Sequence, residues 1–135
     1  PVAWGTVLPG MNYGEDTASE VSGIDVNYVC NGLYDEKVAA LATWIGNLGN
    51  ATLDSSEAVS GANQFSLRAD DDGTLPGAIV VNTAPSNYTA IDTTGTITEE
   101  AGDLVNTNSI WLKLSANFAA DTYNGSIYYQ IAQRY

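Results

Sequence analysis

The fold is indicated most clearly near the end of the chain, by the stretch Ser126-Ile127-Tyr128-Tyr129-Gln130-Ile131-Ala132. Ile127, Tyr129 and Ile131 occupy every second position, and successive side chains of a strand point to opposite faces of a sheet. An apolar face that alternates with a more polar one is typical of antiparallel strands with one buried side. The stretch therefore predicts a half-buried antiparallel strand.

Similar patterns recur along the rest of the chain. Residues 109–115 place Ile110, Leu112 and Leu114 on one face, which we expect to point inward. Further strands are predicted between turns rich in Gly, Pro, Asn and Asp, over residues 2–8, 21–30, 34–44, 50–53, 64–69, 77–82 and 88–98. About eight short strands predict an all-β fold, a single Ig-like or jelly-roll-type antiparallel β-sandwich spanning residues 1–135.

Residues 34–48 leave two interpretations open. Val38, Leu41 and Ile45 have the spacing of one helix face, whereas Val38 and Trp44 also fall on one face of a strand. Because the surrounding segments are predicted to be strands, we expect a strand that ends at Trp44.

The charge of the chain is strongly negative, with 16 acidic residues against 4 basic ones and a net charge of -12. Binding to nucleic acid depends on Lys and Arg clusters that displace counterions, so nucleic acid is a poor partner. Anionic membrane surfaces are disfavoured for the same reason. No apolar run approaches the ~20 residues that a membrane-spanning helix needs.

The residue types that usually carry catalysis are scarce. The chain has no histidine, which removes the commonest general base and the usual zinc ligand. Cys30 is the only cysteine, so an internal disulfide is excluded, and its spacing from Tyr28 predicts a core position. The acidic pairs lie in predicted turns with little apolar surface to shift a pKa, so we expect no enzymatic activity.

The chain begins at Pro1 rather than at a methionine. Removal of a signal peptide would explain this start, and an internal start is the alternative. We favour secretion, and therefore expect an extracellular location at the cell surface.

The turn Asp70-Asp71-Asp72-Gly73 is the densest local group of carboxylates. Calcium takes six to eight oxygen ligands, and Asp70, Asp71 and Asp72 offer some of them. Consecutive aspartates point in different directions, however, so a solvated turn is the favoured alternative. No other cofactor is expected.

Two aromatic residues are predicted to face outward on the last strands. Trp111 shares a face with Lys113, and Tyr128 lies opposite the apolar face of its strand. Because Trp and Tyr are enriched at interfaces, both are candidates for a subunit contact. A sugar-binding surface formed by Trp111, Tyr128 and Tyr129 is the alternative.

Three Asn-x-Ser/Thr tripeptides, which begin at Asn50, Asn87 and Asn124, fall in or beside predicted turns. Glycans on such sites need an exposed loop in a secreted protein. All three asparagines are therefore candidate glycosylation sites.

Several motifs resemble secreted Ig-like modules of archaeal and bacterial cell surfaces. Val2–Gly10 is similar to their opening strand, Phe-Gly-x-Val-x-Pro-Gly, and Cys30–Asp35 to the Asn-Gly turn and aromatic-Asp step that often follow. Trp44 stands where such modules often carry a tryptophan, and Asp121–Tyr129 looks like their final hairpin, which is also similar to the last strand of pilin-like and biofilm-filament subunits.

The resemblance implies a structural subunit of an extracellular, pilus-like filament or biofilm fibre, whose partners are copies of itself. We expect non-covalent assembly by strand addition, in which residues 1–9 or residues 122–135 pair with a sheet edge of a neighbour. Val2, Trp4 and Val7 then join the interface. The alternative function is a monomeric, secreted module that binds carbohydrate or cell surfaces.

Overall fold

The computed structural model describes residues 3–15, 19–30, 32–91 and 102–133. Its strands, in chain order, are β1 (Glu20–Cys30), β2 (Tyr34–Ala40), β3 (Thr43–Ile45), β4 (Asn50–Leu53), β5 (Gln64–Asp70), β6 (Ile79–Val80), β7 (Asn82–Thr83), β8 (Thr89–Ala90), β9 (Gly102–Leu114) and β10 (Ile127–Gln133). The all-β prediction is confirmed, although the described residues form ten strands rather than about eight. Among these residues, no helix has the length and apolar character needed to span a bilayer.

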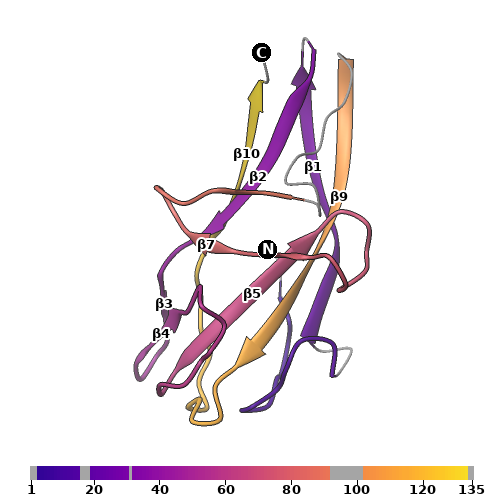
Figure 1. Cartoon of the computed structure of the whole chain (residues 1–135). Coiled ribbons are helices and arrows are strands. Elements are labelled where there is room, and N and C mark those ends of the chain that lie inside the picture. The colour runs from indigo at the N-terminus through magenta and orange to yellow at the C-terminus, as the bar shows by residue number, and fades with distance from the viewer. Residues whose placement is uncertain (1–2, 16–18, 31, 92–101, 134–135) are drawn as a thin grey trace.

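The strands form two sheets that face each other. The larger sheet has the order β1-β9-β5-β4-β3, with β6 paired to β5, and the smaller sheet has the order β10-β2-β7, with β8 paired to β2. In Figure 1, the long strands β1 and β9 run side by side, and β2 runs beside β10. The arrangement is a sandwich whose core lies between the two sheets.

Most of the pairing is antiparallel, as the alternating patterns predict. β9 is the central long strand, and it pairs antiparallel with β1 on one side and β5 on the other. Two short pairings are parallel, β4 with β5 and β2 with β7, each over two residue pairs. Such short contacts between distant segments leave no local pattern in the sequence.

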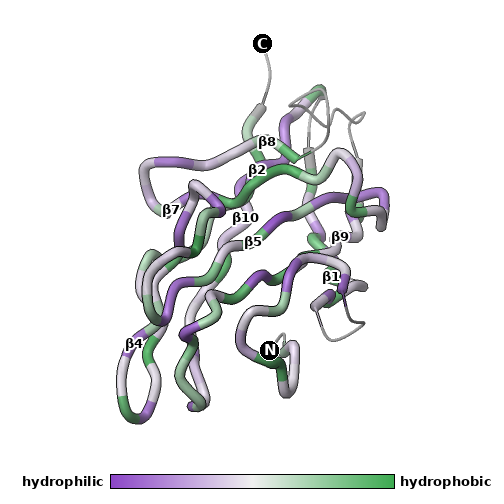
Figure 2. Tube along the Cα trace, turned by 60° about the horizontal axis from the view of Figure 1, so that its bottom comes forward, coloured by the Kyte–Doolittle hydropathy of each residue, from purple (hydrophilic) through white to green (hydrophobic). Residues whose placement is uncertain are grey.

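The core is built from the inward faces of both sheets. Ile110, Leu112 and Leu114 of β9 are buried, which confirms their predicted orientation. Figure 2 shows apolar and polar residues in short alternating stretches along the tube, as expected when each strand has one buried face. The other buried hydrophobic residues of the core are Met11, Val38, Ala40, Ala51, Leu53, Phe65, Leu67, Ala69, Val81 and Ile91.

The strand interpretation of the segment that begins at Tyr34 is confirmed. The segment forms β2 in the smaller sheet, and after Leu41 and Ala42 it enters the larger sheet as β3. The Trp44 ring then lies between Trp4 and Phe65, with ring centroids 6.1 Å and 4.8 Å away. The change of sheet explains why one apolar pattern continues across two strands.

The predicted strand over residues 2–8 is wrong for its described part, since residues 3–8 form no strand. Gly5 has a φ of 74°, which interrupts an extended backbone. The turn after it is confirmed: Met11 N donates to the Leu8 carbonyl at 3.2 Å, and Gly10 has a φ of 76°. Proline followed by a glycine with positive φ is the signature of a type II turn.

Two further strand predictions need correction. The pattern of residues 77–82 predicts one strand, but the structure has β6 in the larger sheet and β7 in the smaller one. Val81 between them is buried and donates its N–H to the Leu67 carbonyl at 2.9 Å. Of the strand predicted over residues 88–98, only β8 is seen, and residues 92–101 lie outside the described part.

Candidate functional site

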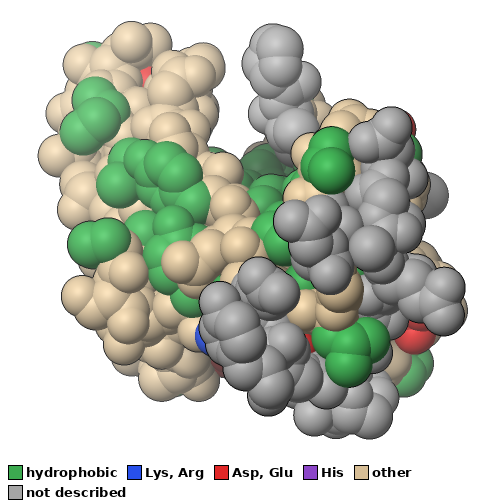
Figure 3. Space-filling view, turned by 90° about the horizontal axis from the view of Figure 1, so that it is seen from above, with side chains coloured by type: hydrophobic (Ala, Val, Ile, Leu, Met, Phe, Trp, Pro, Cys, Tyr) green, Lys and Arg blue, Asp and Glu red, His purple; other side chains and the backbone are tan. Residues whose placement is uncertain are grey.

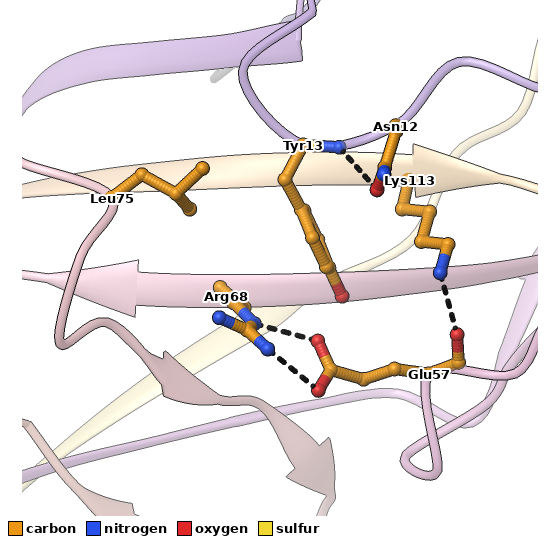
Figure 4. Close-up of a pocket in the computed structure, with 6 residues that line it drawn as sticks. All are labelled: Asn12, Tyr13, Glu57, Arg68, Leu75 and Lys113. Carbon is orange, nitrogen blue, oxygen red and sulfur yellow. Dashed lines mark hydrogen bonds and ion pairs between the residues drawn. The ribbon is translucent and has the colours of Figure 1, made fainter.

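An open pocket lies on the outer face of the larger sheet, the face turned away from the smaller sheet. Its volume is about 320 Å³. Arg68 of β5 and Lys113 of β9 face outward because they alternate with the core residues Leu67 and Leu112. Loops that cross this face supply the other lining residues, Asn12, Tyr13, Glu57 and Leu75 (Figure 4).

Tyr13 is the central side chain of the pocket. Its hydroxyl donates to Ser66 Oγ at 2.6 Å, and the guanidinium carbon of Arg68 lies 5.1 Å from the ring centroid. Lys113 Nζ lies 6.0 Å from the same centroid, so both cations are within the ~6 Å range of cation–π attraction. Burial raises the pKa of the Tyr13 phenol, which therefore stays protonated at neutral pH.

Glu57 ties the loop between β4 and β5 to this face. Its carboxylate accepts two hydrogen bonds from Arg68, at 2.6 Å and 3.0 Å, and its backbone carbonyl accepts one from Lys113 Nζ at 2.9 Å. The bidentate bond from Arg68 lowers the pKa of Glu57. Two of the four basic residues of the chain therefore meet at one glutamate.

The loop that presents Glu57 is strained. Glu57 and Val59 have φ values of 66° and 40°, a region that is unfavourable for residues with a side chain and most of all for a β-branched one. Asp54 holds the loop in this shape, because its carboxylate accepts hydrogen bonds from Val59 N at 2.8 Å and from Ser56. Such strain tends to occur at sites that hold a ligand.

The pKa shifts of the two ionisable groups of the pocket considered above keep each in one charge state. The pKa of Tyr13 is raised and that of Glu57 is lowered, so both groups keep one charge state around neutral pH. General acids and bases need pKa values near the working pH. The outward-facing Arg68 and Lys113 carry no signal in the sequence that links them to Tyr13, because the three residues meet only through the fold.

The carboxylates of the acidic turn accept hydrogen bonds from the turn itself. Asp70 is buried, and its Oδ1 accepts a hydrogen bond from Asp71 N at 2.7 Å. Asp72 is exposed, and its Oδ1 accepts bonds from the amide and hydroxyl of Thr74, both at 2.8 Å. Within the described residues, no group of three or more acidic, Cys or His side chains could hold a metal ion, so calcium stays a prediction that this geometry does not support.

The predicted interface residues are not brought to one surface. Trp4 and Val7 are half-buried and pack against the core, and Val2 lies outside the described residues. Tyr128 is 40% exposed on the outer face of β10, but Trp111 is only 3% exposed, so its predicted accessibility is wrong.

Trp111 lies on the outer face as expected, but it is buried there. It lies opposite Arg68 in the sheet, and Tyr13 extends over Arg68 and Lys113. Tyr129 points into the sandwich and packs against the core. Trp111, Tyr128 and Tyr129 therefore do not form the shared sugar-binding surface considered above.

The three candidate glycosylation sites are all exposed. Asn50 begins β4, and Asn124 forms a β-bridge with Ile45 through its backbone. Asn87 donates its side-chain amide to Thr83 Oγ1 at 3.3 Å. Each side chain lies where a glycan could be attached without disturbing the core.

Strand β10 forms an open edge of the smaller sheet. Within the described part of the chain it pairs with β2 alone. The carbonyl of Glu36 accepts a bond from Ile91, on the side of β2 away from β10. Because Glu36 lies opposite Ile131, the backbone N–H and C=O of Ile131 also point away from the pair, toward the open edge.

A buried glutamate lies between the two sheets, and it is not among the candidate residues predicted from the sequence. Glu36 of β2 is fully buried, and its two carboxylate oxygens accept hydrogen bonds from the amides of Asn106 at 2.6 Å and Asn108 at 2.7 Å. Burial raises its pKa. Alternation along the strand indicates this burial, because Glu36 falls on the same face as Tyr34 and Val38.

Exposed large hydrophobic side chains are scattered over the described surface. Seen from above in Figure 3, they lie in separate patches, and few charged side chains are visible at this end. The most exposed are Leu8, Val29, Leu33, Ile45, Leu48 and Val105. Val29 and Val105 are diagonal neighbours on one face of the β1–β9 pair, because Asn27 lies opposite Val105.

No family model matches the chain, and no curated protein or solved structure matches it significantly. The resemblance to Ig-like surface modules therefore stays a prediction from the motifs quoted above.

Proposed function

We propose that this protein is a structural subunit of an extracellular filament at the cell surface, assembled when a strand of one copy adds to the β10 edge of the next. The observation that carries the proposal is the unprotected character of that edge. β10 has seven residues, Ile-Tyr-Tyr-Gln-Ile-Ala-Gln, with no proline and no charge. Its register with β2 is continuous, without a bulge.

Natural sheets usually protect their edges with short strands, bulges, prolines or charges. The outer strands β1 and β3 of the larger sheet have such protection. β1 has a register shift between Val21 and Ile24 and carries Glu20 and Asp25. β3 has three residues, and its Ile45 is already bridged to Asn124. Compared with β1 and β3, β10 is the edge strand with the fewest features that prevent addition of another strand.

Symmetry limits which strand can be added. Two β10 strands paired about a two-fold axis would form a closed dimer, whereas a filament needs a contact between different segments of the two copies. The favoured donor is the N-terminal segment, residues 1–9. Its described residues 3–8 form no strand within their own molecule.

The proposal is tested by comparing Ile131→Pro with Ile131→Ala. Both variants lose the same half-buried side chain, but only proline removes the N–H that points toward the open edge, and proline is tolerated at such positions. We expect both to unfold at similar temperatures, while negative-stain electron microscopy shows filaments for the wild type and for Ile131→Ala only. Filaments formed equally well by Ile131→Pro would contradict assembly through β10.

A further inference from the structure

We propose that the pocket at Tyr13 binds one unit of a neutral sugar. The inference does not depend on filament formation, because the pocket lies on the outer face of the larger sheet and β10 is an edge of the smaller one. It also differs from the aromatic surface expected from the sequence, since Tyr13 belongs to neither of the last two strands.

The size and walls of the pocket fit a single small ring. Binding sites for small molecules start at about 300 Å³, and this pocket has about 320 Å³. Figure 4 shows Leu75 pointing toward the Tyr13 ring, so these two side chains give the pocket an apolar wall. The C–H face of a sugar ring can pack against such a wall.

The polar groups of the lining offer both donors and acceptors. Lys113 has three N–H donors, of which one goes to the Glu57 carbonyl, and Arg68 uses two of its five donors on the Glu57 carboxylate. Asn12 contributes an amide, whose Oδ1 accepts from Tyr13 N at 2.8 Å. A sugar hydroxyl donates and accepts at once, so it can use neighbouring groups of both kinds.

The charge of the molecule favours a neutral ligand over an anion. Lys113 and Arg68 are opposed locally by Glu57, and the whole chain carries a net charge of -12, which repels anions. A neutral polyol avoids this repulsion and still gains hydrogen bonds to charged groups, which are stronger than those between neutral partners.

The lining is also fixed in place before any ligand arrives. The strained residues Glu57 and Val59 are held by Asp54, Arg68 and Lys113, so the loop does not need to be ordered on binding. A preformed site lowers the entropic cost of association. Backbone strain of this kind is typical of sites where it holds a side chain in position for a ligand.

The test is a titration of the isotopically labelled full chain with glucose, galactose, mannose and N-acetylglucosamine, followed by amide chemical shifts. The Ile131→Pro variant supplies a sample that stays monomeric if β10 mediates assembly. We expect saturable shifts, in the millimolar range, that centre on Tyr13 and Leu75 for at least one of these sugars. No saturable shift with any of the four overturns the proposal.

Two substitutions locate the site. Leu75→Trp adds bulk to the pocket and leaves Arg68 and Glu57 unsubstituted, and Leu48→Trp makes the same change on a turn where Leu48 is 90% exposed. We expect Leu75→Trp to weaken binding at least about tenfold and Leu48→Trp to leave it unchanged. If Leu75→Trp unfolds, the exposed Asn12→Ala serves instead and should weaken binding. Wild-type binding by the pocket variant, or tighter binding of glucuronate than of glucose, would overturn the proposal.

Discussion

Glu36 is a carboxylate buried between the sheets, and among the residues that the structure describes the amides of Asn106 and Asn108 donate to it. Its pKa is raised by burial, so the folded state keeps this proton at pH values where the unfolded chain, with a value near 4.5, has lost it. Its contribution to stability is therefore greatest below pH 4.5 and is lost as the pH rises through the folded pKa. Above its folded pKa the group carries a charge in the core, which lowers the stability of the fold relative to a neutral side chain.

Replacing Glu36 by Gln should raise the unfolding temperature at neutral pH. The amide of the Asn108 side chain can rotate so that its Oδ1 accepts a hydrogen bond from the Gln amide. Asn108 Oδ1 is available for this bond, because it has no hydrogen-bond partner among the described residues. The advantage over the wild type should shrink as the pH falls toward 4.5, since protonation then removes the same charge. The unfolding temperatures of both proteins, measured from neutral pH down to pH 4.5, give this difference. A difference that does not change with pH would show that Glu36 does not titrate in this range.

Trp111 shows that the face on which a strand residue lies does not determine its solvent exposure. The pattern of its strand correctly places it on the outer face with Lys113. Its exposure of only 3% shows that a residue on the outer face can still be buried. A period of two indicates a face of the sheet, whereas accessibility depends on loops that cross that face.

At the scale of the elements, the start of β10 depends on close packing against β3. A Cβ added to Gly125 would lie 2.2 Å from the Trp44 ring, so Gly125→Ala should destabilise the fold by about 1–3 kcal/mol. Gly49→Ala is the matched control, since a Cβ there meets nothing within 4 Å. Chemical denaturation measures both variants, and equal stabilities would show that the chain relaxes around the added methyl group.

The long strands could be predicted because they carry their own pattern. β1, β5 and β10 lie close to their predicted positions, whereas β9 begins at Gly102, well before the strand predicted over residues 109–115, so its first half was not predicted. The two-residue strands and the parallel pairings depend on contacts between distant segments, which a local pattern does not contain. The Tyr13 pocket was missed for the same reason, since segments far apart in the chain build it.

The N-terminal segment shows how one residue can override a pattern. Val2, Trp4 and the residues after them favour a strand by composition, but Gly5 adopts a positive φ and turns the chain. Trp4 still packs against Trp44, as a strand residue would. The proposed donor role would require Gly5 to become extended, which glycine permits without steric cost.

At the scale of the whole molecule, the net charge of -12 opposes assembly. Copies packed within a few ångströms repel one another unless ions screen them, and the screening length falls from about 30 Å at 0.01 M salt to about 8 Å at 0.15 M. Filament formation should therefore strengthen as sodium chloride is added, which light scattering can follow. Dissolution of filaments on adding salt would indicate an interface held by opposite charges instead.

The pocket and the β10 edge lie on different sheets, and this separation matters for a repeated assembly. Each subunit of a polymer joined through β10 would carry one such pocket. A single site of millimolar affinity holds a sugar only briefly. A row of such sites facing a polysaccharide gains avidity, because after the first contact the next sugar unit is already at high effective concentration. Weak recognition by each copy would then suffice for lasting adhesion by the fibre.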